Sequence, residues 1–160
     1  MTGLEFCADL MATGRFFGVG LGSTVSEIDR AVPLTYVEEI DDSGTDARRD
    51  YGLVEASLVK DNEWTLTGLI LELHRLSGSA DLLREVQIDA GVSFQRYTPW
   101  SQLEEAFSTA AHDASLQSVQ QGDFLEYRNV DAKVSVLVVN DNAERGEWPG
   151  HGDVWSISMG

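Results

Sequence analysis

The sequence predicts an α+β fold in which short helices pack on one face of an antiparallel sheet. Apolar and polar residues alternate over several short segments, which is the pattern of half-buried strands. Apolar residues at helical spacing occur in short stretches between those segments. The chain has 160 residues, of which 42% are hydrophobic, so it is long enough to bury a core without disulfide bonds.

The N-terminal segment is expected to form a helix over residues 4–11, because apolar residues recur there at helical spacing from Leu4 to Met11. Gly14 is expected to end this helix. Residues 15–21 are apolar and rich in glycine. They predict either a short strand or a tight connection.

A second helix is predicted over residues 24–32. Thr24 is followed three residues later by Glu27, which is the spacing of a capping box. Pro33 is expected to stop this helix, because proline cannot continue the hydrogen-bonded ladder.

Residues 38–50 predict an acidic loop with a turn at Ser43-Gly44. The run from Asp41 to Asp46 lacks the alternating ligand spacing and the closing glutamate of an EF-hand. We therefore expect a solvated loop or a contact with a partner here, and no metal site. The carboxylates of this loop are Glu38, Glu39, Asp41, Asp42, Asp46 and Asp50.

Two strands follow, over residues 51–59 and 64–76, and the turn at Asp61-Asn62 joins them into a hairpin. The small polar residues 77–80 are the best candidate for a boundary within the chain.

The second half begins with residues 83–97, which are predicted to be extended. A helix is expected to open at Pro99, with Ser101 and Glu104 as a capping box. Trp100 and Trp155 are expected to lie in the core, because both fall within apolar periodicity. Strands are predicted at residues 124–128, 133–140 and 153–159, with a polar loop at residues 141–152.

The order of helix, loop and strands therefore occurs twice, over residues 1–78 and 79–160, and indicates two tandem halves packed as one compact unit. Helices on one face of an antiparallel sheet would leave the other face open to solvent or to a partner.

Charge narrows the choice of partner. The chain has 27 acidic and 11 basic residues and a net charge of −16, which repels nucleic acid and anionic membranes and attracts basic proteins. The same charge also serves solubility alone. The single cysteine, Cys7, permits no internal disulfide, and no signal peptide or membrane span is visible, so a cytoplasmic protein is expected.

No catalytic motif is present. The three histidines are far apart in the sequence, without the spacing of a zinc site, and there is no nucleophile elbow or P-loop. A Cys7–histidine dyad or a pair of carboxylates that meet only in space stays open. We expect a protein that is not an enzyme and holds no cofactor or metal.

Two resemblances point to a function. Residues 21–33 resemble the opening of the helix-plus-sheet module of β-lactamase inhibitor proteins and of outer-membrane assembly lipoproteins. In the inhibitors the module occurs twice in tandem, as in the two halves above.

Residues 48–55, followed by Trp64 and by His74-Arg75-Leu76, resemble small actinobacterial proteins that are identified as immunity proteins of polymorphic toxins. This resemblance extends over residues 14–76 and 152–158. It implies that the chain neutralises a cognate toxin, such as a nuclease, by tight docking of an acidic surface on a basic enzyme.

The predicted contacts are aromatic residues beside acidic turns, because a few aromatics anchor protein interfaces and charges surround them. The protein is expected to be a monomer when free. The alternatives are a structural or regulatory interaction module, and a small-molecule binding protein with a pocket between sheet and helices. The predicted partner-binding residues are Asp41, Asp42, Asp46, Asp50, Tyr51, Asp61, Glu63, Trp64, Glu144, Glu147 and Trp148.

Overall fold

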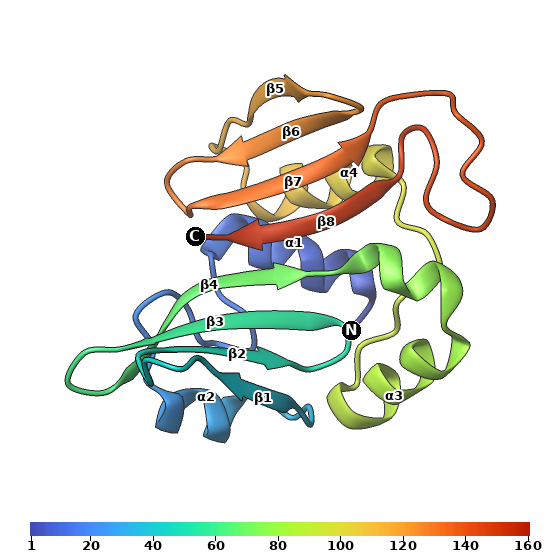
Figure 1. The fold of residues 1–160 in the computed structure, drawn as a ribbon. Coiled ribbons are helices and arrows are strands. Elements are labelled where there is room, and N and C mark those ends of the chain that lie inside the picture. The colour runs from blue at the N-terminus through green and yellow to red at the C-terminus, as the bar shows by residue number, and fades with distance from the viewer.

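The computed structural model describes residues 1–160 and contains one open, eight-stranded antiparallel sheet (Figure 1). The α+β class is therefore confirmed. Two four-stranded meanders meet side by side, in the order β1-β2-β3-β4-β8-β7-β6-β5. The strands are β1 (Val37–Ile40), β2 (Asp46–Asp50), β3 (Val54–Lys60), β4 (Trp64–Leu71), β5 (Gln117–Gln121), β6 (Phe124–Asn129), β7 (Val134–Val139) and β8 (Val154–Met159).

The helices lie behind the sheet in the view of Figure 1, apart from α3, which follows the short helix η1 at the end of β4. Helix α1 packs against α4 and β7, and α2 packs against β4. The helical elements are α1 (Gly3–Thr13), α2 (Val25–Ala31), the 3₁₀ helix η1 (Leu73–Gly78), α3 (Ala80–Ala90) and α4 (Trp100–Ala110). None of these helices combines the length and the apolar character needed to cross a bilayer.

Local sequence signals set the first two helices as predicted. Thr24 caps α2, and Glu27 returns the hydrogen bond to the backbone of Thr24, so the predicted capping box is confirmed. Gly14 ends α1 with a φ of 64°. A side chain at Gly14 would also collide with the carbonyl oxygen of Ala132, so two constraints select glycine at this position. Residues 15–21 form the tight connection and not a strand, with a bridge between Phe16 and Val19.

The predicted acidic loop at residues 38–50 is wrong, because these residues form the β1–β2 hairpin. Opposite charges face each other across the pair, as in Glu39 and Arg48, which makes the charged strands compatible. Ala47 and Arg49 are buried and the residues beside them are more exposed. Burial therefore alternates along β2, although one of the buried residues is an arginine.

The extended segment predicted at residues 83–97 is wrong over residues 83–90, which belong to α3 (Ala80–Ala90), whereas residues 91–97 are not helical. Ser79 caps this helix, and Gly91 ends it in a left-handed conformation. Val86 is its one buried residue, so the apolar stripe of this helix is narrow. Such a stripe gives little helical periodicity in the sequence, and the alternating residues around it predict an extended segment instead.

Three further details differ from the sequence-based prediction. Helix α4 starts after Pro99 without a side-chain cap, so Ser101 and Glu104 do not form a capping box. The segment 64–76 is a strand only to Leu71, and η1 follows it. Strand β5 was not predicted, because all its residues are exposed and it carries no alternation.

The hydrophobic core lies between the sheet and the helices and joins both halves of the chain. The last strands of the two meanders pair, with Leu71 opposite Ile157. The side-chain amide of Asn129 in β6 donates to the carbonyl of Met11 in α1, 2.8 Å away.

Candidate functional site

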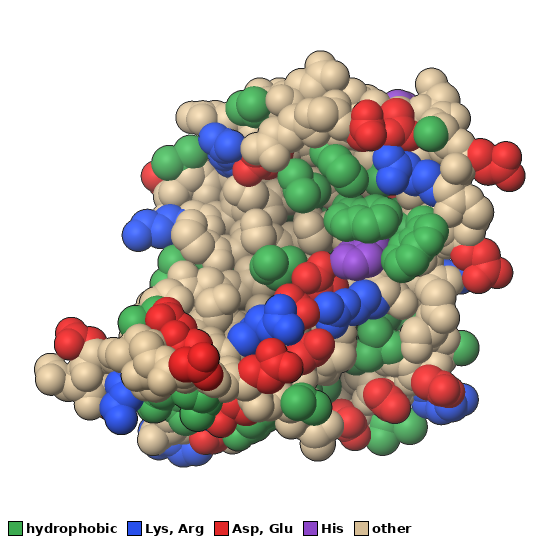
Figure 2. All heavy atoms as spheres, viewed as in Figure 1, with side chains coloured by type: hydrophobic (Ala, Val, Ile, Leu, Met, Phe, Trp, Pro, Cys, Tyr) green, Lys and Arg blue, Asp and Glu red, His purple; other side chains and the backbone are tan.

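The face of the sheet turned away from α1, α2 and α4 is covered by no helix, and we call it the open face. Alternation along β7 shows the two sides. Val134, Val136 and Val138 are buried toward the helices, and Ser135 and Leu137 between them are less buried and turn toward the open face. Figure 2 views this face and shows aromatic and charged side chains gathered over it.

Four rings meet at one end of the open face and form what we call the aromatic cluster: Phe124, Trp148, Trp155 and His74. The imidazole of His74 stacks on Trp155 with centroids 4.5 Å apart and an interplanar angle of 3°. Trp148 lies 5.7 Å from Trp155 and 5.8 Å from His74, and Phe124 lies 5.9 Å from Trp155. Trp148 is 53% exposed, so a large apolar surface is presented to solvent on a rigid platform.

Trp155 was expected in the core, and the structure places it on the open face instead. The register between β7 and β8 shifts between Leu137, which pairs with Ser156, and Val138, which pairs with Val154, so that Trp155 is the extra, unpaired residue of β8. A bulge of this kind breaks the alternation of sides along a strand. Ile157 and Met159 keep their predicted places in the core.

Arg145 closes the aromatic cluster from the loop between β7 and β8. Its guanidinium carbon lies 5.7 Å from the ring of Phe124 and 5.9 Å from that of Trp155. Its Nη2 donates to the carboxylate of Asp141 at 2.6 Å, and this contact lowers the pKa of Asp141. The Tyr97 hydroxyl donates to the carbonyl of Glu147 at 2.7 Å, so this contact and the Arg145–Asp141 pair both fasten the loop just before Trp148.

The ring of His74 is partly buried between a carboxylate and a backbone carbonyl. Its Nδ1 lies 3.3 Å from the carboxylate of Glu72 and 3.4 Å from the carbonyl of Trp155. Burial lowers the pKa of His74 and raises the pKa of Glu72, because both charged forms lose water there. The imidazole therefore serves as an uncharged aromatic surface near neutral pH.

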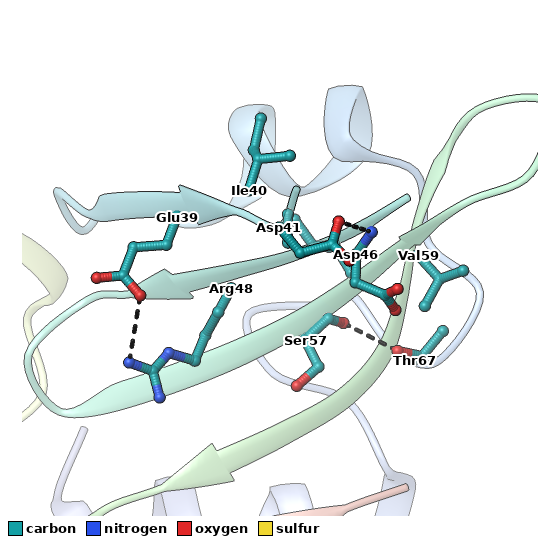
Figure 3. A pocket seen from close by; sticks show the side chains of 10 residues that line it. Glu39, Ile40, Asp41, Asp46, Arg48, Ser57, Val59 and Thr67 are labelled. Carbon is teal, nitrogen blue, oxygen red and sulfur yellow. Dashed lines mark hydrogen bonds and ion pairs between the residues drawn. The ribbon is translucent and has the colours of Figure 1, made fainter. Parts of the chain in front are cut away.

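The opposite end of the open face is acidic. There the β1–β2 turn borders a shallow hollow of about 360 Å³ (Figure 3). Asp41 organises this turn, since its carboxylate accepts from the backbone N–H groups of Thr45 and Asp46 and from the hydroxyl of Ser43. These hydrogen bonds lower the pKa of Asp41. Glu39, Asp46 and Arg48 also line the hollow, so its three carboxylates outnumber its one cation.

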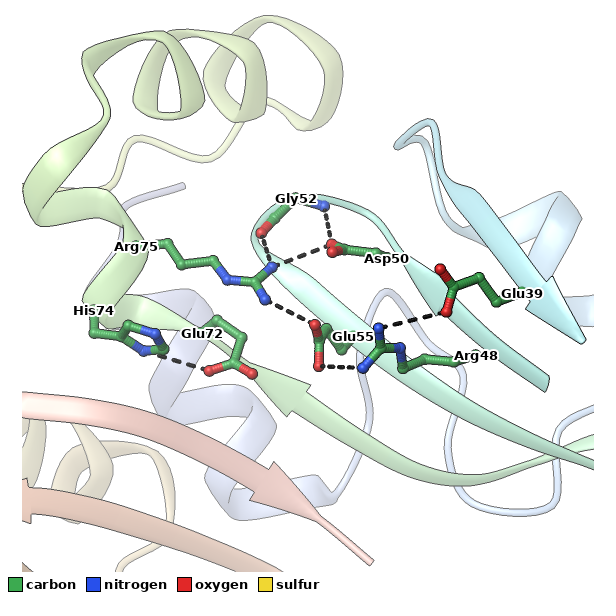
Figure 4. Close-up of polar contacts among 8 residues, drawn as sticks. All are labelled: Glu39, Arg48, Asp50, Gly52, Glu55, Glu72, His74 and Arg75. Carbon is green, nitrogen blue, oxygen red and sulfur yellow. Dashed lines mark hydrogen bonds and ion pairs between the residues drawn. The ribbon is translucent and has the colours of Figure 1, made fainter. Parts of the chain in front are cut away.

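Between the two ends, alternating charges cross the strands in what we call the charge ladder: Glu39, Arg48, Glu55, Arg75 and Asp50 (Figure 4). The shortest contacts are those of Arg75, at 2.7 Å from Glu55 and 3.1 Å from Asp50. Arg48 bridges Glu39 and Glu55 at 3.7 and 3.9 Å. The arginines are thus compensated within the face itself.

A second depression, of about 370 Å³, lies where β4 meets β8. Serine and glycine line much of it, and their small side chains leave the backbone of the sheet accessible to a partner. Its small residues are Ser57, Gly68, Ser135, Ser158 and Gly160.

The predicted acidic contacts divide between the two ends of the sheet. The β1–β2 and β3–β4 turns share one end, and the β7–β8 loop lies at the other, because β8 runs antiparallel to β4. Together they lie at the two ends of the open face, and we call them the acidic rim. The rim consists of Asp41, Asp42, Asp46, Asp61, Glu63, Glu144 and Glu147.

Two predicted aromatic contacts lie elsewhere. Tyr51 is only 7% exposed and belongs to the core, where it packs against Tyr36. Trp64 packs against the core on the side of Leu66, away from the open face. Of the predicted aromatics, Trp148 alone reaches the cluster.

Sequence reasoning missed four members of this end of the site: His74, Phe124, Trp155 and Arg145. They come from three elements and a loop, and His74 and Trp155 are 81 residues apart. A tryptophan inside an alternating strand gives no sign that a bulge will turn it outward. The charges of Arg145 and Asp141, four residues apart, were the only local signal.

No three histidine, cysteine, aspartate or glutamate side chains are grouped so as to hold a metal ion. Cys7 is fully buried, and burial raises the pKa of its thiol far above the ordinary value. Comparisons of the chain with protein families, with curated sequences and with solved structures gave no significant match.

Proposed function

We propose that this protein is an inhibitor of the immunity type, which binds a basic enzyme such as a nuclease toxin on its open face and neutralises it. The observation that carries this proposal is the aromatic cluster, exposed at one end of an uncovered face that has carboxylates of the acidic rim at both of its ends. Protein interfaces combine a few aromatic anchors with charged residues at their periphery.

Trp148 is the principal anchor. It is half exposed, yet His74, Trp155 and the fastened loop hold it in place, so little conformational entropy is lost when a partner covers it. Truncation of such an anchor costs about 2 kcal/mol or more, which corresponds to roughly a 30-fold loss of affinity.

The acidic rim is the second part of the proposed interface. Its carboxylates and the net charge of −16 would attract a basic enzyme from a distance and raise the association rate. An enzyme that acts on nucleic acid carries a basic surface for phosphates. An acidic protein that covers this surface excludes the substrate, and it needs no catalytic group of its own.

We place this function in the cytoplasm and assign it to a monomer without a cofactor. The single buried cysteine supports a reducing compartment, because a chain with one cysteine cannot use an oxidising compartment to form an internal disulfide.

The test is capture of the partner from cells that encode this protein, with wild-type and Trp148→Ala proteins as baits. Ile88→Ala is the matched control, because Ile88 is 73% exposed but lies on α3, which contributes no residue to the aromatic cluster. Wild type and the Ile88 variant should retain one basic enzyme in equal amounts, and the Trp148 variant should lose it. The purified enzyme should then be inhibited at a 1:1 ratio.

Two results would contradict the proposal. One is a partner retained equally by all three baits, which would move the contact away from the aromatic cluster. The other is a captured enzyme that stays fully active in the complex, which would make the protein an interaction module without inhibitory function.

A further inference from the structure

The two edges of the sheet differ in how they are protected. Edge strand β1 carries Glu38 and Glu39 among its four residues, and charges on an edge discourage pairing with other chains. Edge strand β5 has the sequence Gln117-Ser-Val-Gln-Gln121, which contains neither charge nor proline, and all five residues are exposed. In a chain with 24% charged residues, this is an unprotected edge.

The outward hydrogen-bonding groups of β5 follow from the pairing of the neighbouring strands. The N–H of Asn140 donates to the carbonyl of Asp123 at 2.7 Å, so Asp123 turns its backbone toward β7. Because these groups alternate along an antiparallel strand, Phe124, Glu126 and Arg128 turn theirs toward β5.

Their partners Gln117, Val119 and Gln121 are thereby bonded to β6, and Ser118 and Gln120 point their N–H and C=O groups away from the sheet. No backbone or side-chain group of the chain bonds to those outward groups.

The edge is continuous with the open face. Gln117, Val119 and Gln121 lie opposite residues of β6 that share this face, and Gln121 is opposite Phe124 of the aromatic cluster. Val119 is 43% exposed. A strand added to β5 would therefore extend the surface on which the aromatic cluster lies.

Exposed carboxylates flank β5, with Asp113 four residues before its start and Asp123 two residues after its end. The one cation beside the strand, Arg128, is paired with Glu126. We propose that β5 is a docking edge that takes up an extended segment of the basic partner, with cationic residues flanking about five residues in β conformation. This inference rests on the proposed function for the identity of the partner. Backbone hydrogen bonds would supply affinity, and Val119 and the two carboxylates would supply selectivity.

A second copy of this chain fits the edge less well. An antiparallel self-pair centred on Val119 would place Asp123 of one copy opposite Ser115 of the other, two residues from Asp113, at both ends. Like charges at that distance oppose pairing, and the net charge of −16 on each copy adds to the repulsion.

The test needs no identified partner. Its probe is a blocked heptapeptide with the sequence arginine, threonine, valine, threonine, valine, threonine, arginine, added to the full-length protein. Hydrogen exchange measured by NMR should slow about tenfold or more at the Ser118 and Gln120 amides and stay constant at Val119, which is already bonded to β6. Unchanged exchange at Ser118 and Gln120 with the peptide at millimolar concentration would overturn the proposal.

Matched peptides and variants sharpen the result. A peptide with alternate backbone amides N-methylated should give no protection, and a peptide with glutamate in place of both arginines should give much less. Ser118→Pro removes one outward donor without touching the β5–β6 ladder and should abolish protection at Gln120, whereas Ser118→Ala should retain it. Should the proline variant fail to fold, the N-methylated peptide on the wild-type protein decides.

The two proposals fail separately. Trp148→Ala should leave protection by the peptide intact, although it should lose the captured enzyme. A peptide that gives no protection, beside an enzyme that still depends on Trp148, would remove β5 from the interface and leave the proposed function standing. Oligomers seen in the free protein, abolished by Ser118→Pro, would instead assign the edge to a second copy.

Discussion

Arg48 and Arg49 are adjacent in the sequence but lie on opposite faces of β2. Arg48 is exposed on the open face within the charge ladder. Arg49 is only 4% exposed and points toward the helices, where it bonds Asp29 of α2 at 2.7 Å and Glu38 of β1 at 2.9 Å. Its guanidinium carbon also lies 4.0 Å from the ring centre of Tyr36. One buried cation thus fastens a helix and an edge strand to the sheet.

Arg49→Ala should therefore lower the free energy of unfolding by about 2–3 kcal/mol, because two carboxylates lose their partner and a buried space opens. The matched change Arg48→Ala should cost less than about 1 kcal/mol, since its ion pairs are exposed to solvent. Denaturant unfolding measures both values. Equal losses for the two variants would show that the buried contacts of Arg49 add nothing.

His74 gives a prediction on pH. Burial lowers its pKa in the folded protein, whereas in the unfolded chain it has the ordinary value near 6.5. The unfolded state therefore takes up this proton first, and stability falls as the pH drops below about 6.5 toward the lower pKa of the folded state. An NMR titration should give a midpoint below 6.5.

The variant His74→Phe keeps a ring on Trp155 and removes the titration. It should flatten the dependence of stability on pH below about 6.5. A midpoint for His74 at or above 6.5 would contradict the predicted effect of burial.

Among the elements, the β1–β2 hairpin departs most instructively from the sequence-based prediction. Its turn depends on Asp41, whose carboxylate accepts two backbone N–H groups and one hydroxyl. Asp42, the next residue, makes no such contact and is exposed. The two neighbouring carboxylates thus differ, because that of Asp41 organises the turn and that of Asp42 forms no hydrogen bond within the chain.

Asp41→Ala should speed hydrogen exchange at the Thr45 and Asp46 amides severalfold, and Asp42→Ala should leave it unchanged. Because hydrogen bonds lower the pKa of Asp41, its contribution is present above the ordinary aspartate pKa and is lost as the pH falls through the lowered one. Protection of both amides in the Asp41 variant would exclude this role of the carboxylate.

For association with the captured enzyme, we expect the exposed carboxylate of Asp42 to matter. Asp42→Ala together with Asp46→Ala should slow association with the captured enzyme and weaken its dependence on salt, without unfolding the protein. Association kinetics at low and high salt measure this. Rates equal to those of wild type would remove this part of the acidic rim from the encounter.

At the scale of the whole molecule, the two halves of the chain share one core and one sheet. The β4–β8 seam, the packing of α1 on α4 and the hydrogen bond from Asn129 to Met11 all cross between them. The open face also belongs to both, because the charge ladder comes from the first half and most of the aromatic cluster from the second.

Residues 1–78 and residues 79–160, produced separately, should therefore lack cooperative thermal unfolding, whereas the full chain should unfold in a single transition. Each fragment would expose core side chains along β4 or β8 and one side of α1 or α4, and chains of about 80 residues have little stability to spare. Circular dichroism against temperature measures this. Two fragments that each melt cooperatively would show that the halves are independent domains.

The sequence by itself determined the features that depend on neighbouring residues. The α+β class, the end of α1 at Gly14, the capping box of α2, and strands β6, β7 and β8 follow from periodicity and capping within short windows. The acidic character and Trp148 as a contact could also be proposed from it. Tertiary structure alone decided which side chains meet.

The physical reason is that a site on a sheet is assembled across strands. A bulge turned Trp155 outward, η1 placed His74 upon it, and the pairing of β4 with β8 joined the charge ladder to the aromatic cluster. The buried Arg49 and Tyr51 and the helix α3 show the same rule, since long-range packing overrode their local patterns. Periodicity fixes the side of an element on which a residue lies, and only the assembled sheet fixes its neighbours.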